Sequence, residues 1–310
     1  IKGYYFTATN GYEIRYNGEF ANVVKDWYLG FKAQFNSPNY AMNFFGYGNN
    51  SFNPQTSENK NRDFNRVRIR KAIVGTFLKW RGELGAKITI AANFQNFDIE
   101  KTNGRFLETQ YAAGNSVFKA QNFFNTEAKY QYQHADNPAF PTLGLAFDAL
   151  LGHTRNLNEI SNFSYAASSL AITYKLIPNG KLVLASKVHG RFTFGDNFEF
   201  YQGASIGGSE GLRGFRNERF TGKNAYYHTT DIRYNMSNLR TAILPINIGV
   251  YGGFDYGQVW GKPATLTVLP RETQFPTTSY GGGVFLNAAN MLTTSVGVFT
   301  GNEGARITFN

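Results

Sequence analysis

The segment ELGAKITIAANFQ, residues 83–95, has the pattern that decides the fold. Its apolar side chains occupy every second position, namely Leu84, Ala86, Ile88, Ile90, Ala92 and Phe94. The positions between them hold mainly polar residues, namely Glu83, Lys87, Thr89, Asn93 and Gln95. A helix would scatter these two sets around its circumference, whereas successive side chains of a β-strand point to opposite faces. The segment therefore predicts a strand with one apolar and one polar face.

The same period of two recurs along the chain, for example at residues 127–133, 169–176 and 181–194. Such runs reach the ~9–11 residues with which a tilted strand crosses a bilayer, and no run approaches the ~18 apolar residues of a membrane helix. The pattern predicts about 14 or 15 strands.

The connections between these strands alternate in length. Short connections are expected at residues 80–83, 136–138 and 177–180, and long polar ones at 46–63, 100–121, 152–162, 200–224 and 261–275. Outer-membrane barrels have short periplasmic turns and longer extracellular loops. The alternation therefore predicts an all-β, transmembrane, antiparallel up-and-down barrel.

The composition agrees with a barrel wall that faces lipid on one side and water on the other. The chain has 29 Phe, 19 Tyr and 33 Gly among 310 residues, and it has no Cys. Disulfides and Cys-based metal sites are therefore excluded. No linker or low-complexity tract divides residues 1–310, which are expected to form one barrel domain. The first strand is expected to precede Ile1, and the last strand to be cut short.

The formal net charge of +10 first suggests a nucleic-acid partner. The sequence has no long Lys/Arg run and no nucleic-acid motif, so no nucleic-acid partner is expected. The closely spaced Arg66, Arg68 and Arg70 share one face of a predicted strand. This pattern favours a positively lined lumen, or contact with lipopolysaccharide phosphates at the rim of the barrel.

No catalytic or metal-binding pattern is found in the sequence. The four histidines, His134, His153, His189 and His228, fit no metal-ligand spacing. Nucleophile-elbow, P-loop and dinucleotide motifs are missing as well. We therefore expect this segment to have no enzymatic activity, no metal and no cofactor.

One long loop contains the segment GGSEGLRGFRNERF, residues 207–220. It resembles the sixth-loop signature, with its (V/L)RGF core, of the superfamily that contains BamA, TamA and the two-partner-secretion transporters. The resemblance implies a barrel of about 16 strands whose sixth loop folds into the lumen. The loop residues that match or support the signature are Leu212, Arg213, Gly214 and Phe215, with Gly207, Gly208 and Gly211.

The resemblance also implies acidic partners for Arg213 on the next two strands. Asp231 in TTDIRY, residues 229–234, and Asp255 in FDYGQVW, residues 254–260, match the family's two acidic positions. Periodicity places both carboxylates on the polar face of their strands. A guanidinium that binds both carboxylates would offset the unfavourable burial of its charge. Arg216 and Arg219 are expected to lie on the loop surface or to fill the lumen without specific partners.

Two further segments, YNGEF at residues 16–20 and SPNYAMNFFGYGN at residues 37–49, resemble another group of barrels. In some bacteroidete chains, those barrels follow a calcineurin-like metallophosphoesterase domain. From the residues alone, NFFGYGN is equally explained as a glycine-bent strand end with aromatic side chains at the membrane interface.

Three functions follow from these interpretations. The first is an integral outer-membrane barrel that inserts, translocates or displays proteins through a weakly closed seam. The second is an anchor or export barrel for a metallophosphoesterase domain before Ile1. The third is a diffusion porin, against which the long inward loop argues. The expected partners are outer-membrane lipid and lipopolysaccharide, with client outer-membrane proteins or accessory subunits under the first function. The sequence shows neither repeated periplasmic modules nor a terminal aromatic residue at Asn310.

Overall fold

The computed structural model describes residues 1–51, 53, 63–112, 114–240, 245–264, 275–289 and 291–309. In these residues no helix is long and apolar enough to span a membrane. The strands are β1 (Lys2–Phe6), β2 (Gly11–Val24), β3 (Trp27–Asn36), β4 (Ala41–Asn43), β5 (Arg66–Arg81), β6 (Lys87–Ile99), β7 (Gln121–Ala135), β8 (Gly144–Asn156), β9 (Asn162–Lys175), β10 (Leu182–Phe194), β11 (Ala204–Ile206), β12 (Phe220–Gly222), β13 (Asn224–Arg240), β14 (Pro245–Trp260), β15 (Thr277–Ala288), β16 (Leu292–Gly301) and β17 (Gly304–Phe309). Short helical turns are α1 (Phe106–Gln110), η2 (Glu83–Gly85), η3 (Ser116–Phe118) and η4 (Phe200–Gln202).

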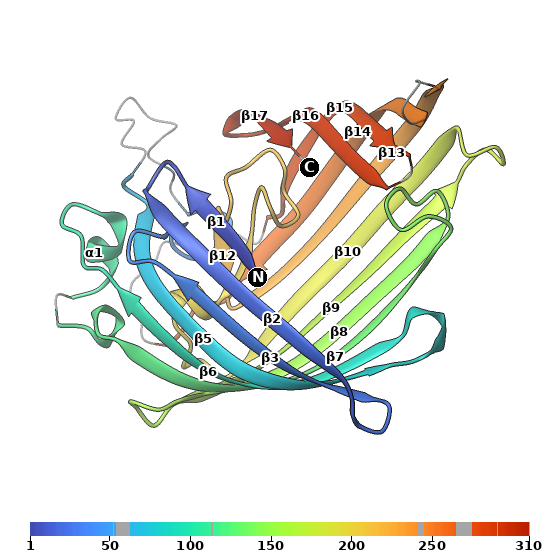
Figure 1. The fold of residues 1–310 in the computed structure, drawn as a ribbon. Helices are drawn as coiled ribbons and strands as arrows, with labels where there is room; N and C mark the ends of the chain where they lie inside the picture. The colour runs from blue at the N-terminus through green and yellow to red at the C-terminus, as the bar shows by residue number, and fades with distance from the viewer. Residues whose placement is uncertain are drawn as a thin grey trace.

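One large antiparallel sheet forms the wall. It has fifteen strands in the order β1-β2-β3-β5-β6-β7-β8-β9-β10-β13-β14-β15-β16-β17, with β4 paired to β5 beside this path. The strands of the path pair in chain order, as expected for an up-and-down fold. The short β11 and β12 form a separate two-stranded sheet, and Thr221 of β12 also forms a β-bridge with Tyr47. The sheet curls so that β1 and β17 face each other across a gap, with the β11–β12 segment inside (Figure 1).

The two faces of the wall differ as the period of two predicts. Outward side chains are apolar and exposed, such as Val74 (61%), Leu151 (64%) and Phe254 (51%). Inward side chains such as Asn93 and Asn125 are 1% exposed and joined by a hydrogen bond of 3.0 Å. An exposed apolar belt around a polar interior is the arrangement that a lipid bilayer favours. We call this interior the lumen.

The strand predicted to begin at residue 83 begins later in the structure, after the first residues of the apolar alternation. Glu83–Gly85 forms a 3-10 turn, and β6 starts at Lys87. Leu84 has φ 54° and is 71% exposed, so it does not continue the apolar face. Gly85 has φ +85° and lies against the carbonyl of Gln133, where a Cβ would collide. The turn is therefore fixed by local backbone geometry, which the alternation of side chains does not report.

The predicted difference between short turns and long loops holds with two corrections, the first being that the β7–β8 connection, predicted at residues 136–138, covers residues 136–143. Residues 152–156 belong to β8, so the connection to β9 is only residues 157–161. Polar side chains on both faces hide the alternation where a strand rises above the lipid, so the sequence pattern of this end of β8 resembles that of a loop. The predicted loops 46–63 and 261–275 lie partly outside the described residues.

Two of the three closely spaced arginines on β5, Arg68 and Arg70, do not line the lumen. Val67 and Ile69 point inward and are buried, so the alternate side chains of Arg68 and Arg70 point outward. Arg68 lies 3.2 Å from Glu100 and Arg70 lies 2.8 Å from Asp98, and all four side chains are substantially exposed. Acidic neighbours therefore offset the positive charge that the sequence suggested for this face.

Two segments fill the lumen from its ends. At the extracellular end, aromatic residues of several loops form a buried cluster around Phe44, Phe200 and Val117. At the opposite end, the β7–β8 turn carries Phe140, which is 8% exposed and packs on Phe285 of β15 with ring centroids 5.0 Å apart. This turn, predicted as a simple short connection, therefore crosses to the far wall.

Candidate functional site

The β11–β12 segment forms a hairpin that lies within the lumen, and we call residues 204–222 the lumenal hairpin. Its strands pair Ala204 with Gly222 and Ile206 with Phe220. The LRGF residues lie at its tip, where Leu212 is 0% and Phe215 2% exposed. Both pack in one cluster with side chains of β13 and β14. Apolar burial therefore fixes the hairpin against the wall that carries the two predicted acidic residues.

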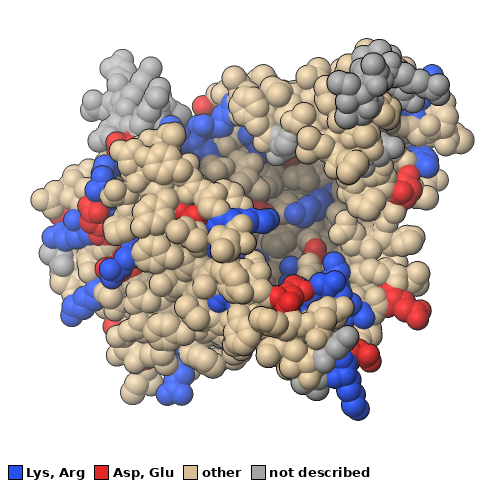
Figure 2. Space-filling model, in the orientation of Figure 1, with Lys and Arg blue, Asp and Glu red and all other residues tan. Residues whose placement is uncertain are grey.

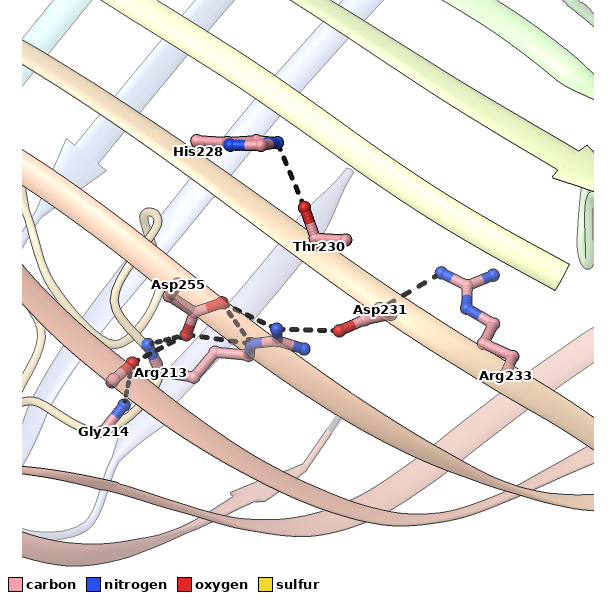
Figure 3. A network of polar contacts seen from close by, with 8 residues as sticks. Arg213, Gly214, His228, Thr230, Asp231, Arg233 and Asp255 are labelled. Atoms are coloured by element: carbon pink, nitrogen blue, oxygen red, sulfur yellow. Dashed lines mark hydrogen bonds and ion pairs between the residues drawn. The ribbon is translucent and has the colours of Figure 1, made fainter.

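Arg213 contacts the two acidic residues that the sequence singled out. Its Nη2 lies 2.6 Å from Asp255 Oδ1 and 2.8 Å from Asp231 Oδ1. Its Nε donates to Asp255 at 3.1 Å, so the guanidinium binds this carboxylate through two nitrogens. The guanidinium also lies 4.0 Å from the ring centroid of Phe299. Figure 3 shows these side chains converging from the hairpin and from neighbouring strands.

Asp255 is 0% exposed and is held by further donors. The backbone N–H of Arg213 donates to its Oδ2 at 2.9 Å, and the hydroxyl of Ser279 donates to the same atom at 2.7 Å. The N–H of Gly214 in turn donates to Ser279 Oγ at 3.2 Å. These donors satisfy the hydrogen-bonding capacity of a carboxylate that water does not reach. These hydrogen bonds therefore hold the backbone at Arg213 and Gly214 to both β14 and β15.

Asp231 joins two cations. Besides Arg213, its second oxygen lies 3.9 Å from Arg233 Nη2 on the same strand. Burial acts to lower the pKa of Arg213, but hydrogen bonds to Asp255 and Asp231 raise it above the ordinary value. Arg213 therefore stays charged, and the two carboxylates compensate its burial.

The loop glycines permit close approach of the hairpin to the wall. A Cβ on Gly214 would lie 2.7 Å from the carbonyl carbon of Thr300 and 2.9 Å from the nitrogen of Gly301, both on β16. Gly211 has φ +89°, a conformation that L side chains rarely adopt. The hairpin tip therefore requires glycine at these two positions for separate reasons.

Sequence reasoning missed a second arginine. Arg219, expected to have no specific partner, is 3% exposed and contacts Glu303 Oε1 at 2.6 Å through Nε. Its other nitrogens donate to the hydroxyl and carbonyl of Ser51. Its guanidinium lies between two rings, 4.6 Å from Phe45 and 4.5 Å from Phe220. Burial lowers the pKa of Arg219, and the charge of Glu303 acts to raise it.

The partners of Arg219 belong to segments far apart in the sequence, so no spacing motif reports them. Ser51 and Phe45 follow β4, whereas Glu303 lies in the β16–β17 turn. Asn53 donates to the second oxygen of Glu303 at 2.7 Å. The contact therefore links the lumenal hairpin to the first long loop and to the closing hairpin of the sheet.

Residues 43–51, which include NFFGYGN, form an inner strap across the lumenal hairpin. The N–H of Gly48 donates to the carbonyl of Thr221 at 2.8 Å. Asn49 donates to the carbonyl of Gly257 at 3.1 Å and accepts from the N–H of Val259 at 2.7 Å. The strap buries Phe44 and Phe45 to 1% exposure. The alternative expectation of interfacial aromatics is therefore wrong for these two rings.

A cavity of about 960 Å³ lies where the two ends of the sheet face each other. Phe6 and Thr9 line it from one side, and Arg306 and Phe309 from the other. Arg213 of the lumenal hairpin also contributes to its wall. Figure 2 shows a hollow in this part of the molecule, with Lys and Arg side chains on its walls. In the described part of the chain, β1 and β17 form no ladder with each other.

Nothing in the described ranges resembles a metal centre, since no group of three His, Asp or Glu residues is suitably placed there. His189 stacks on Tyr227 with ring centroids 5.0 Å apart. His228 Nε2 lies 2.8 Å from Ser186 Oγ and 3.0 Å from Thr230 Oγ1. Both rings therefore make ordinary polar and stacking contacts within the wall.

Comparison with known proteins identifies the class of this barrel. The model of the family described as haemolysin secretion/activation protein ShlB/FhaC/HecB matches residues 93–270, more than half of the chain. No curated protein matches the chain. The fold and the family match define an integral outer-membrane β-barrel of the Omp85 superfamily. Within that superfamily, the chain belongs to the ShlB/FhaC/HecB family, a family of secretion proteins and not of enzymes.

Two solved structures share the fold. The crystal structure of BamA from Haemophilus ducreyi lacking POTRA domains 1–3 has a TM-score of 0.66 at 14% identity, over 96% of this chain and 61% of that one. CdiB from Escherichia coli has a TM-score of 0.59 at 8% identity, over 99% of this chain and 57% of that one. This chain therefore spans about three fifths of the length of the structures it matches.

Proposed function

We propose that this barrel translocates polypeptides across the outer membrane or inserts them into it. The observation that carries the proposal is the arginine site. A lumenal hairpin blocks the interior, and one buried guanidinium holds its tip to two strands. An open diffusion pore needs an unobstructed lumen, whereas a polypeptide pathway requires a closed resting state. The family's description as secretion proteins supports the same function.

The proposed pathway uses the two ends of the sheet. Unpaired strand edges offer backbone N–H and C=O groups with which an extended client segment can pair. The cavity of about 960 Å³ beside β1 and β17 gives such a segment access to the edges. The lumenal hairpin forms one wall of this cavity through Arg213, so a shift of the hairpin changes the space available to a client.

The test compares surface and secreted proteins of a strain that lacks the complete gene with strains that express the full-length protein or its variants. Loss of the gene is expected to remove one or a few proteins from the outer membrane or the medium. Arg213→Ala is expected to lower their level about tenfold, because Asp255 is left buried without its cation. Lys223→Ala removes a cation from the same loop, whose partner Asp196 is 57% exposed, and is the matched control. Identical surface and secreted proteins in all strains would contradict the proposal.

The second candidate is an anchor barrel for a metallophosphoesterase domain. Its support is the resemblance of residues 16–20 and 37–49 to barrels of that kind. It is tested by hydrolysis of p-nitrophenyl phosphate with added divalent metal. Activity of the full-length protein that is lost from the isolated barrel would support the anchor. No activity in either would exclude it and leave translocation.

A further inference from the structure

A second cavity lies deeper in the lumen, away from the arginine site. Its volume is about 250 Å³, several times the ~30 Å³ that one water molecule occupies in the liquid. Inward side chains of β3 and of β5 to β10 form its wall, and η4, which precedes the lumenal hairpin, covers it. The space therefore accepts a small polar ligand as well as water.

The charged side chains that line this cavity are mostly positive. They are Lys32, Lys71 and Arg191, against the single carboxylate of Glu127. That carboxylate already accepts from the hydroxyl of Tyr165 at 2.7 Å and lies 3.8 Å from Lys32. Lys71 forms no ion pair among the described residues, and its Nζ lies 5.7 Å from the ring centroid of Phe97. Among the described residues, Lys71 and Arg191 therefore have no carboxylate at ion-pair distance, although the charges of Glu13 and Glu218 act on Lys71 and that of Glu127 acts on Arg191.

Several buried donors around the same cavity lack acceptors. Arg191 donates through Nη2 to the carbonyl of Gln202 at 2.9 Å, but its buried Nε has no partner among the described residues. Gln202 accepts through Oε1 from the N–H of Glu199, which leaves its buried Nε2 without an acceptor. The buried hydroxyl of Tyr201 also has no partner there. Unpaired buried donors are unfavourable, and all three belong to residues that line this one cavity, which points to a ligand that accepts hydrogen bonds.

The wall of the cavity also has a residue with a buried hydrogen-bond acceptor that lacks a donor. Asn93 donates through Nδ2 to Asn125, while its buried Oδ1 has no hydrogen-bond partner in the described part of the chain. A hydrogen phosphate ion has three acceptor oxygens for donors such as Arg191 and one O–H for an acceptor such as Asn93. Sulfate and chloride have no such O–H group. The set of unpaired groups therefore fits a protonated phosphate better than either ion.

From this geometry we propose that the lumen holds a phosphate-binding site. Arg191 and Lys71 supply the positive charge, and Gln202 and Tyr201 supply neutral hydrogen bonds. The ligand is hydrogen phosphate, or the terminal group of a small phosphomonoester bound in its singly protonated form. Because η4 contributes donors and leads directly into the lumenal hairpin, a bound phosphate also holds the base of that hairpin to the wall.

The test uses the full-length protein in detergent, titrated by calorimetry at pH 7 with sodium phosphate, glycerol phosphate, sodium sulfate or sodium chloride at constant ionic strength. We expect saturable binding of phosphate that is at least about tenfold tighter than that of sulfate. Arg191→Gln and Lys71→Gln are each expected to weaken phosphate binding about tenfold, since each removes a charged hydrogen-bond donor. Glycerol phosphate distinguishes the two ligand sources, because it binds only if the cavity admits an ester.

Two controls keep the result interpretable. Lys187→Gln removes a lumenal cation on the same strand as Arg191 that does not line the cavity, and it is expected to bind phosphate unchanged. Arg191→Lys retains the charge and is expected to restore part of the affinity lost in Arg191→Gln. Absence of saturable phosphate binding by the unaltered protein would overturn the proposal. Equal weakening by Lys187→Gln and Arg191→Gln would do the same, because it would indicate general attraction to a positive lumen.

Discussion

Arg219 and Glu303 make the residue-scale contact that the sequence least suggested. Their side chains are 4% and 8% exposed, so removal of one leaves the other charge buried. Glu303→Ala is expected to destabilise the docking of the inner strap by about 3 kcal/mol, a typical value for breaking a buried pair. Hydrogen exchange at the amides of Gly48 and Ser51 should then accelerate about a hundredfold. Asp196→Ala, which breaks the exposed pair with Lys223, is the control, and unchanged exchange in Glu303→Ala would disprove the role of this contact.

Glu199 gives the extracellular end of the lumen a dependence on pH. Burial, and then the charge of Glu159, raises the pKa of Glu199 to about 7 from its ordinary value of 4.5. Between pH 4.5 and about 7, Glu199 is therefore protonated when residues 195–203 are docked in the lumen. When this segment is released, Glu199 loses the proton. The docking of the segment is most stable below pH 4.5, weakens by at most about tenfold per pH unit as pH rises from 4.5 to about 7, and changes little above that.

This dependence can be measured as protease sensitivity of residues 195–203 between pH 5.5 and 8.5. We expect cleavage to increase with pH in the unaltered protein, and Glu199→Gln to remove the increase because its amide does not titrate. Glu159→Gln should lower the pKa and shift the transition toward lower pH. A cleavage rate with the same pH profile in Glu199→Gln and in the unaltered protein would contradict the assignment.

At the scale of elements, the β7–β8 turn acts as a plug at the end of the lumen opposite the long loops. Asp136 closes the turn by accepting from the N–H groups of Thr142 and Leu143. Burial acts to raise the pKa of Asp136, but these hydrogen bonds and Lys175 hold it well below the usual range. The carbonyl of Ala139 accepts from Thr293 of β16 at 2.9 Å. The turn is therefore a defined structure and not a loose connection.

Phe140→Ala is expected to weaken the docking of this turn by about 3 kcal/mol, the typical effect of truncating a buried phenylalanine. Channel conductance in a planar bilayer should rise as the turn leaves the lumen. Leu143→Ala alters an apolar side chain of the same turn that is 49% exposed, so its conductance should stay at the unaltered level. If Phe140→Ala conducts no better than Leu143→Ala, the turn does not block the lumen.

The elements themselves were largely predictable from sequence, because lipid imposes the period of two on every membrane-crossing strand. The prediction failed where other forces act. The start of β6 is set by the glycine turn at residues 82–86, and the end of β8 by strand pairing above the lipid. Arg213, Asp231 and Asp255 could be singled out because a family motif contains them. The contacts of Arg219 join residues 84 and 168 positions apart, and no local pattern encodes such contacts.

At the scale of the whole molecule, the wall and the lumenal hairpin are separate structures with separate stabilities. The wall consists of continuous antiparallel ladders, whereas the lumenal hairpin is held by one apolar cluster and a few buried ion pairs. Regions with fewer supporting contacts open without unfolding of the rest. The lumenal hairpin can therefore leave its docked position while the barrel remains intact.

Arg213→Ala tests this separation. We expect the variant to retain the slow migration of a folded barrel in unheated SDS gels, because no ladder hydrogen bond is lost. Its lumenal hairpin should become at least about tenfold more sensitive to trypsin, since Asp255 is left uncompensated. Lys223→Ala should match the unaltered protein in both assays. A loss of the folded gel band in Arg213→Ala alone would show that the wall and the lumenal hairpin unfold as one cooperative unit.

The inner strap has a consequence for the order in which the molecule is assembled. Asn49 binds the carbonyl of Gly257, 208 positions later in the chain, and Asn53 binds Glu303, 250 positions later. Contacts of such separation form only after the intervening chain has been made and folded. The strap therefore docks among the last steps of biogenesis, after β14 and the β16–β17 turn are in place. Until that step the newly formed barrel has an interior that the strap has not yet sealed, so the partly assembled barrel is expected to let small ions cross the membrane more readily than the finished one.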